Sequence, residues 1–142
     1  FLDRSGARSA TTRIVEDFDV RTPGIDTSAR ALSGGNQQKL VIGREMASSP
    51  RLLVAAHPTR GIDVGAKASV WADLRAARRD GLAVLLVSAD LEELIGLADR
   101  LMVMLRGRIV AELDPSTTTP RLLGGHMTGA TGDATGDEGR TP

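Results

Sequence analysis

The 142-residue sequence contains no cysteine and no tyrosine, one tryptophan and two phenylalanines. The lack of cysteine excludes disulfide bonds and thiolate metal sites. The scarcity of aromatic side chains argues against a stacking platform for nucleic-acid bases. Lys and Arg number 18, and Asp and Glu number 18, so the net charge is zero. There is therefore no electrostatic case for binding nucleic acid or an anionic membrane.

Long hydrophobic runs are also missing, since none approaches the ~20 residues needed to cross a bilayer, and no signal-peptide pattern occurs. With 41% hydrophobic and 25% charged residues, the composition is that of a soluble globular protein. The length predicts at most one domain. Because the first residue is Phe1 and not Met, we expect a piece of a longer chain, with a cytosolic location as the default.

The most informative stretch is Leu-Ser-Gly-Gly-Asn-Gln-Gln-Lys at residues 32–39, which we call the signature stretch. Ser33 is a good N-cap for the apolar helical pattern that follows. Gly34 and Gly35 lack side chains, so a ligand can approach the backbone. Free N–H groups at a helix start form an anion site. Two interpretations stay open: a phosphate-contacting loop that opens a helix, or a serine-capped helix after a glycine turn.

The rest of the chain alternates between helical and strand patterns. Residues 1–13 are polar without a clear period and are interpreted as the frayed end of a helix, and Ile14, Val15 and Phe18 fit one helical face. Further on, the patterns predict helices over 33–47 and 66–79 and from 91, strands buried on both faces over 52–56 and 83–87, a hairpin over 101–113, one short helix after 114, and a disordered tail over 128–142.

This order predicts an α/β fold with a parallel-sheet core. Loops at the carboxyl ends of parallel strands are the default ligand sites, and residues 57–63 and 88–90 occupy those positions.

The signature stretch resembles the signature loop of ABC-type ATPases. Residues 52–66, LLVAAHPTRGIDVGA, resemble the Walker B strand at 52–56 and the D-loop at 58–63 of the same family. The NQQK ending together with PTRGIDVGA is similar to the double-cassette ATP-binding subunits of sugar or nucleoside importers. The resemblance covers residues 30–113, and more loosely 14–29 and 114–130.

The resemblance implies a partial P-loop NTPase fold, the ABC cassette, with a parallel-sheet core, a signature helix over 33–47, a C-terminal β-hairpin and a disordered tail. Residues 1–113 would be the C-terminal portion of a nucleotide-binding domain, with a switch region at 88–90. Residues 114–142 would add a short helix and the tail. The degenerate Walker B resembles the second, C-terminal cassette of such subunits.

Three positions depart from the family pattern. The Walker B strand of the family ends in Asp-Glu, which orient the magnesium shell and the attacking water, whereas this chain has Ala56 and His57. Ala56 has no oxygen for Mg²⁺. His57 is not a carboxylate, and a lone His after a strand is more often structural or solvent-facing. Ala89 stands where the family often has a His that contacts the γ-phosphate, and it has no donor for a phosphate oxygen.

The G-x-x-x-x-G-K-[ST] motif that cradles phosphates is missing as well. We therefore predict no intact catalytic residue and no metal ligand in this chain. On its own it is expected neither to hydrolyse ATP nor to bind it tightly.

Other positions match the family: Ser33, Gly34, Gly35 and Gln37 in the signature stretch, and Asp63 in the D-loop. The resemblance implies that the four signature residues contact the γ-phosphate of ATP held by a partner cassette, and that Asp63 is presented to the same cassette. ATP and Mg²⁺ would then occupy a composite site between two cassettes. Permease subunits would hold the assembly at the cytoplasmic face of the plasma membrane. Arg60 is either a solvated loop arginine or an interface residue.

The function that this resemblance implies is that of an ATP-binding subunit fragment of an ABC importer for sugars or nucleosides, which couples ATP hydrolysis to transport. One alternative is a non-catalytic dimerisation or regulatory cassette without a nucleotide role. Another is an ABC-type ATPase outside transport, which NQQK and PTRG disfavour.

Overall fold

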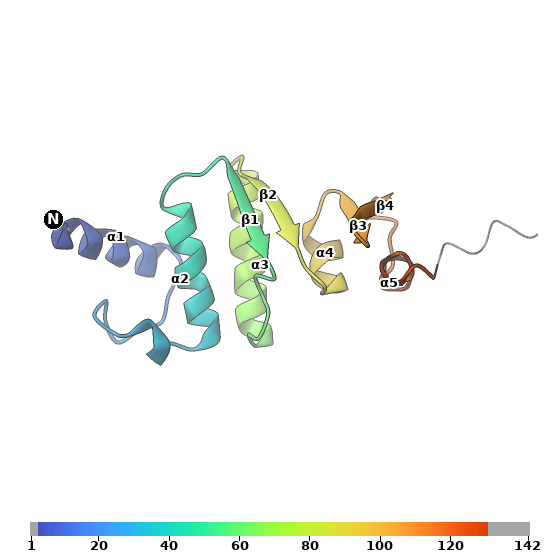
Figure 1. The fold of residues 1–142 in the computed structure, drawn as a ribbon. Coiled ribbons are helices and arrows are strands. Elements are labelled where there is room, and N and C mark those ends of the chain that lie inside the picture. The colour runs from blue at the N-terminus through green and yellow to red at the C-terminus, as the bar shows by residue number, and fades with distance from the viewer. Residues whose placement is uncertain (1–2, 131–142) are drawn as a thin grey trace, which may run out of the picture. The chain divides into compact units, whose positions relative to one another are not determined.

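The computed structural model describes residues 3–130, so most of the predicted tail over 128–142 lies outside the described residues. The elements follow one another in an α/β order (Figure 1), namely α1 Arg4–Asp17, a 3₁₀ turn Ala29–Ala31, α2 Gly34–Met46, β1 Leu52–Ala56, α3 Val64–Arg79, β2 Ala83–Val87, α4 Leu91–Leu97, β3 Leu101–Leu105, β4 Arg108–Leu113 and α5 Pro120–Thr128. The chain forms two compact units, Phe1–Val87 and Ser88–Pro142.

The first unit is built on a two-stranded parallel sheet. β1 and β2 pair in register from Leu52 with Ala83 to Ala56 with Val87, and α3 provides the crossover between them. Both strands have the bounds that the apolar runs predicted, so the parallel core is confirmed. The apolar face of α3, through Val70, Leu74 and Ala77, is buried.

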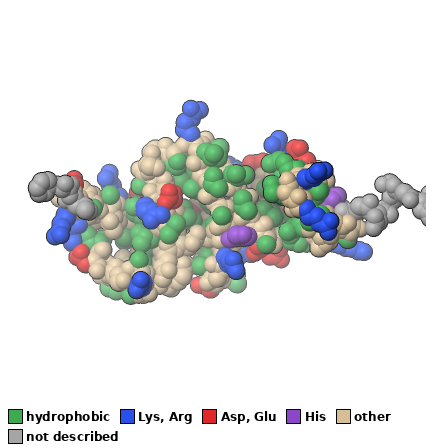
Figure 2. Space-filling view, viewed as in Figure 1, with side chains coloured by type: hydrophobic (Ala, Val, Ile, Leu, Met, Phe, Trp, Pro, Cys, Tyr) green, Lys and Arg blue, Asp and Glu red, His purple; other side chains and the backbone are tan. Residues whose placement is uncertain are grey.

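Only one face of this sheet is covered, which corrects the prediction of strands buried on both faces. Leu52 and Val54 of β1 are 55% and 58% exposed, and Leu85 and Val87 of β2 are each 47% exposed. Ala55, which points to the opposite face, is buried. Hydrophobic side chains accordingly lie at the surface over β1 and β2 in Figure 2. The apolar run was typical of a two-sided strand, but in the first unit α3 packs on one side of it.

Helix α1 begins much earlier than the sequence suggested. Asp3 caps it by accepting a hydrogen bond from the N–H of Gly6 at 2.9 Å, and the helix then runs to Asp17. None of its residues is fully buried. A helix without a buried stripe has no hydrophobic period to detect, which explains why residues 1–13 were interpreted as a frayed end.

Helices α1 and α2 approach each other closely at Gly43. A methyl group added at Gly43 would lie 2.5 Å from Ile14 Cγ2 and 2.8 Å from Phe18 Cδ2. Ile14 and Phe18 belong to the helical face that the sequence predicted, and that face packs against α2.

The second unit is a β-hairpin covered by two helices. β3 and β4 pair antiparallel around the turn at Arg106 and Gly107, as predicted. Leu101, Val103 and Leu123 form its buried core, so α5 packs on β3. Thr119 caps α5 and Pro120 stands at its first position, which suits proline. Within residues 3–130 no helix combines the length and apolar character that a membrane span requires.

We predict that Gly43→Ala destabilises the protein by about 1–3 kcal/mol, because the added methyl overpacks the contact between α1 and α2. Urea denaturation followed by circular dichroism measures this change. Gly124→Ala in α5 is the control, since its methyl would meet only Leu91 at 3.8 Å. That control should be neutral or stabilising by up to ~1 kcal/mol through helix propensity. Equal effects of both substitutions would contradict the assignment of Gly43 to a packing role.

Candidate functional site

The starts of α2 and α3 lie side by side, at the end of the sheet where β1 and β2 finish (Figure 1). A methyl group on Gly34 would lie 3.5 Å from both the carbonyl oxygen of Gly61 and Cγ2 of Ile62. The signature stretch and the D-loop therefore meet within the first unit. Two neighbouring helix N-termini bring two sets of unpaired N–H groups to one place, which favours an anion.

Ser33 caps α2 as predicted. Its Oγ accepts hydrogen bonds from the side-chain amide of Asn36 at 2.9 Å and from the backbone N–H of Asn36 at 3.5 Å. Both bonds use the hydroxyl as an acceptor, so its proton points elsewhere. Ser33 and Gly34 are exposed. The exposed hydroxyl and the first N–H groups of α2 can therefore contact a phosphate that arrives from outside.

Gly35 has a different role from the one that the sequence suggested. It is buried, and a methyl group there would clash with Cβ of Ala66 in the first turn of α3. Its missing side chain lets α2 pack against α3. Of the two glycines, only Gly34 lies on the accessible side.

Polar side chains of the signature stretch hold the loop in place. The Gln37 amide donates to the carbonyl of Leu32 at 2.8 Å, so Gln37 folds back on the loop although it is exposed. Asn36 Oδ1 accepts from the backbone N–H of Arg21 at 2.8 Å. These bonds fix the entry to α2 and leave Ser33 as the side chain of the stretch best placed for a ligand.

The end of β1 carries the degenerate Walker B positions. Ala56 and His57 are exposed, and the backbone N–H of His57 donates to the carbonyl of Val87 at 2.7 Å. His57 has a φ of +50°, an uncommon conformation for a residue other than glycine. The strand therefore turns sharply at His57, and no carboxylate is present at either position.

The D-loop residues take structural positions next to this turn. Asp63 caps α3, because its Oδ1 accepts from the N–H of Ala66 at 2.9 Å. Arg60 is exposed, and its backbone N–H donates to the carbonyl of His57 at 3.1 Å. Arg60 therefore lies in an exposed loop between β1 and α3.

Ala89 belongs to the second unit, at the entry to α4. Ala89 is exposed. The residues on either side of it hold this turn: Ser88 Oγ accepts a hydrogen bond from the N–H of Asp90 at 3.0 Å, and Asp90 caps α4. The first unit thus brings Gly34 of the signature stretch next to Gly61 and Ile62 of the D-loop.

Lys39, the last residue of the signature stretch, has a role that the sequence analysis missed. Its side chain is 11% exposed, and its ammonium donates to the backbone carbonyl of Asp19 at 3.1 Å and to the Asp19 carboxylate at 3.4 Å. Burial raises the pKa of Asp73 on α3, an effect that the charge of Lys39 opposes and that of Asp19 reinforces. Lys39 therefore links α2 to the segment after α1 and acts on α3.

Several curated proteins similar to this chain are import ATP-binding proteins. The guanosine import ATP-binding protein NupO of Bacillus subtilis is 52% identical over 118 residues, which are 83% of this chain and 23% of that protein. The ribose import ATP-binding protein RbsA of Yersinia pestis is 42% identical over 132 residues, which are 93% of this chain and 26% of that protein. The chain thus spans about a quarter of the length of the curated relatives it matches. No protein-family model matches the sequence.

Solved structures show the same fold. The dimeric post-hydrolysis state of the ATP-binding cassette MJ0796, bound to ADP and Pi, superposes with a TM-score of 0.69 at 21% identity, over 81% of this chain and 50% of that one. The fold of the chain is therefore that of a partial ABC cassette, a P-loop NTPase architecture, as the sequence predicted.

The close contact between α2 and α3 leads to a second prediction. Gly35→Ala should destabilise the protein by about 1–3 kcal/mol, because the new methyl meets Cβ of Ala66. Ala66→Gly alone should cost up to about 1 kcal/mol of helix propensity. In the double variant the clash is absent, so urea denaturation should give a favourable coupling energy of at least about 0.5 kcal/mol between the two sites. Strict additivity would mean that Gly35 does not serve this contact.

Proposed function

We propose that this chain is part of the ATP-binding subunit of an ABC importer for sugars or nucleosides, and that it donates its signature stretch to ATP held by a partner cassette. The observation that carries the proposal is the exposed pair Ser33 and Gly34 at two adjoining helix N-termini. The end of β1 in the same unit carries Ala56 and His57 and so offers no carboxylate. The site is built to contact an anion and lacks the groups that would activate water for it.

The physical basis is the match between this end of the first unit and a terminal phosphate. The helix starts offer N–H groups, and the Ser33 hydroxyl offers a proton, close to charge that grows during phosphoryl transfer. The partner cassette would supply the P-loop and the Walker B carboxylates that hold ATP and Mg²⁺. A dimeric arrangement is a property of the similar cassette MJ0796, and we extend it to this chain as part of the proposal.

Several finer features belong to the same proposal. Residues 1–113 would be the C-terminal portion of a second cassette, and residues 114–142 an appended helix and tail. Gln37 and Asp63 would support the phosphate-contacting residues through their bonds to Leu32 and Ala66. Permease subunits would place the assembly at the cytoplasmic face of the plasma membrane. The substrates named for NupO and RbsA are a guanosine and a ribose, which suit a nucleoside or sugar importer.

One observation favours the alternative of a non-catalytic dimerisation or regulatory cassette. Most of the residues that match the family also serve the fold, since Gly35 packs on Ala66, Gln37 holds the loop and Asp63 caps α3. Folding alone would require them. A functional test must therefore keep these contacts and change only the charge presented to the ligand.

Ser33→Asp in the full-length subunit is the substitution that meets this requirement. Aspartate is an equally good N-cap, so α2 stays capped, but its negative charge repels a phosphate. We expect ATPase activity to fall by about 100-fold or more, the scale of losing a donor to developing charge. Ser33→Thr keeps the hydroxyl and should retain most of the activity.

His57→Asn provides the matched control at the degenerate Walker B position. Asparagine tolerates the positive φ of His57, so the turn is kept. We expect its ATPase activity to stay close to that of the unmodified subunit. Full activity of Ser33→Asp would refute signature donation, and an inactive first cassette in the unmodified subunit would favour the non-catalytic alternative.

The isolated 142-residue chain should bind ATP only weakly, because its sequence contains no P-loop motif to cradle the β- and γ-phosphates. Isothermal titration calorimetry with Mg-ATP should show no heat at micromolar concentrations. A micromolar Kd would contradict the view that the site completes ATP bound elsewhere.

A further inference from the structure

Lys39 on α2 is a largely buried cation, and both of its hydrogen bonds go to Asp19. Its ammonium donates to the backbone carbonyl of Asp19 at 3.1 Å and to the Asp19 carboxylate at 3.4 Å. The second contact is long for a charge-assisted hydrogen bond, which ordinarily measures about 2.7–2.9 Å. The Asp19 side chain is 77% exposed, so water solvates its charge without help from Lys39. The buried ammonium is therefore held mainly by a backbone carbonyl.

The segment that receives these bonds has a strained backbone. Asp19 has a φ of +46°, a left-handed conformation that is uncommon for residues other than glycine and that costs free energy to maintain. Two residues later, the backbone N–H of Arg21 donates to Asn36 Oδ1 on α2 at 2.8 Å. The segment after α1 is thus tied to α2 twice, once through Lys39 and once through Asn36. Loss of the Lys39 tie would let Asp19 relax.

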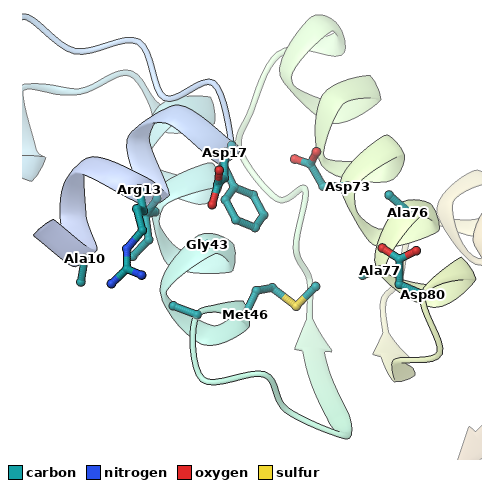
Figure 3. A pocket seen from close by; sticks show the side chains of 12 residues that line it. Ala10, Arg13, Asp17, Gly43, Met46, Asp73, Ala76, Ala77 and Asp80 are labelled. Atoms are coloured by element: carbon teal, nitrogen blue, oxygen red, sulfur yellow. The ribbon is translucent and has the colours of Figure 1, made fainter.

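Asp73 on α3 is a carboxylate that needs a cation. Its Oδ2 is buried and has no hydrogen-bond partner among residues 3–130. Burial raises the pKa of Asp73, and the charge of Lys39 opposes that effect. In Figure 3 the Asp73 carboxylate extends from α3 toward the opposite wall of a groove that α1, α2 and α3 line together. A buried carboxylate without a partner is costly, so an ammonium that reached it would stabilise its charged form.

The packing of α2 on α3 brings Lys39 within reach of Asp73. The two helices run in the same direction from adjoining starts (Figure 1), where Gly35 meets Ala66. Lys39 follows Gly35 by one helical turn and Asp73 follows Ala66 by two, so both lie on the faces through which the helices meet. The advances along the axes are about 6 Å and about 10.5 Å, respectively. The flexible four-carbon stem of a lysine covers the difference. Gly43, one turn beyond Lys39 on the same face, lines the groove together with Asp73.

We propose that Lys39 is a two-position switch, whose ammonium moves between the Asp19 carbonyl and carboxylate and the buried carboxylate of Asp73. In the position that the structure shows, α2 is tied to the segment after α1. In the other position α2 is tied to α3, and Asp19 leaves its positive φ. Each position satisfies one group and gives up another, which keeps the two close in free energy. The switch thus selects which neighbour holds the signature helix. This inference does not depend on the nucleotide proposal, because the position of Lys39 is measured without nucleotide.

Asp19→Asn is the substitution that should move Lys39 to Asp73. Asparagine tolerates a positive φ, so the variant removes the competing charge without forcing a new backbone. In its crystal structure we expect the Lys39 ammonium at a hydrogen-bond distance of about 2.7–3.2 Å from Asp73 Oδ2. Glu16→Gln is the matched control, because it removes an exposed carboxylate of α1, and it should leave Lys39 on Asp19. An ammonium that stays on residue 19 in both variants would overturn the proposal.

The unfolding equilibrium in urea tests the switch through the sign of one substitution. In the unmodified chain Asp73→Asn should lower the unfolding equilibrium constant or leave it unchanged, because it removes a buried charge that has no partner. In Asp19→Asn, where Lys39 relies on Asp73, the same substitution should raise that constant about fivefold or more. Lys39→Met fills similar space without a charge and should abolish this dependence on residue 19. An equal effect of Asp73→Asn with either residue at position 19, or a dependence that persists in Lys39→Met, would contradict the switch.

Amide hydrogen exchange measures the release of the segment after α1. The N–H of Arg21 should exchange several-fold faster in Asp19→Asn than in the unmodified chain, because the segment loses its tie to Lys39 and keeps only the bond to Asn36. Adding Asp73→Asn should restore slow exchange, since Lys39 then returns to the carbonyl of residue 19. Fast exchange that persists in the double variant would mean that Asp19→Asn loosens the segment by itself, and the switch would be refuted.

Discussion

The close packing of α2 against α3 at Gly35 is the contact on which the site depends. Any side chain larger than hydrogen at this position would meet Cβ of Ala66, and the two helix starts would separate. Since Ala66 also donates its N–H to Asp63, the same turn of α3 receives both the helix contact and the cap. The juxtaposition of two helix N-termini, and hence the anion-favouring field at Ser33, follows from this one contact.

The largely buried side chain of Lys39 secures the other side of α2. Burying a lysine is costly unless the charge is paired and hydrogen-bonded. Lys39 meets that condition through the carbonyl and the carboxylate of Asp19. Burial raises the pKa of Asp73 on α3, the charge of Lys39 opposes this effect, and the buried Oδ2 of Asp73 has no hydrogen-bond partner among the described residues. Lys39 therefore ties the signature helix to the segment after α1.

The sequence predicted the elements that carry a strong local signal. The apolar runs at 52–56 and 83–87 and the alternating pattern with a glycine turn at 101–113 gave strands with the observed pairing. Helix α1 was missed over its first turns because none of its residues is fully buried. The exposure of Leu52 and Leu85 was not predicted. A continuous apolar run indicates that a strand is suited to burial on both faces, but it does not show whether this chain supplies a cover for each face.

For the site, the sequence identified Ser33 as a helix cap and, by resemblance, Asp63 as a D-loop residue, but only tertiary contacts could separate the two glycines. Gly34 is exposed and Gly35 is buried. Because both residues are glycine, the sequence alone cannot distinguish them. The same holds for Lys39, whose partner Asp19 is distant in sequence. These contacts explain why a matching signature stretch is weak evidence for chemistry by itself: Gly35, Gln37 and Lys39 each satisfy a folding requirement. The Ser33 hydroxyl proton and the open backbone at Gly34 have no such requirement to meet. The proposed nucleotide role of this chain therefore depends on the Ser33 hydroxyl and the Gly34 backbone.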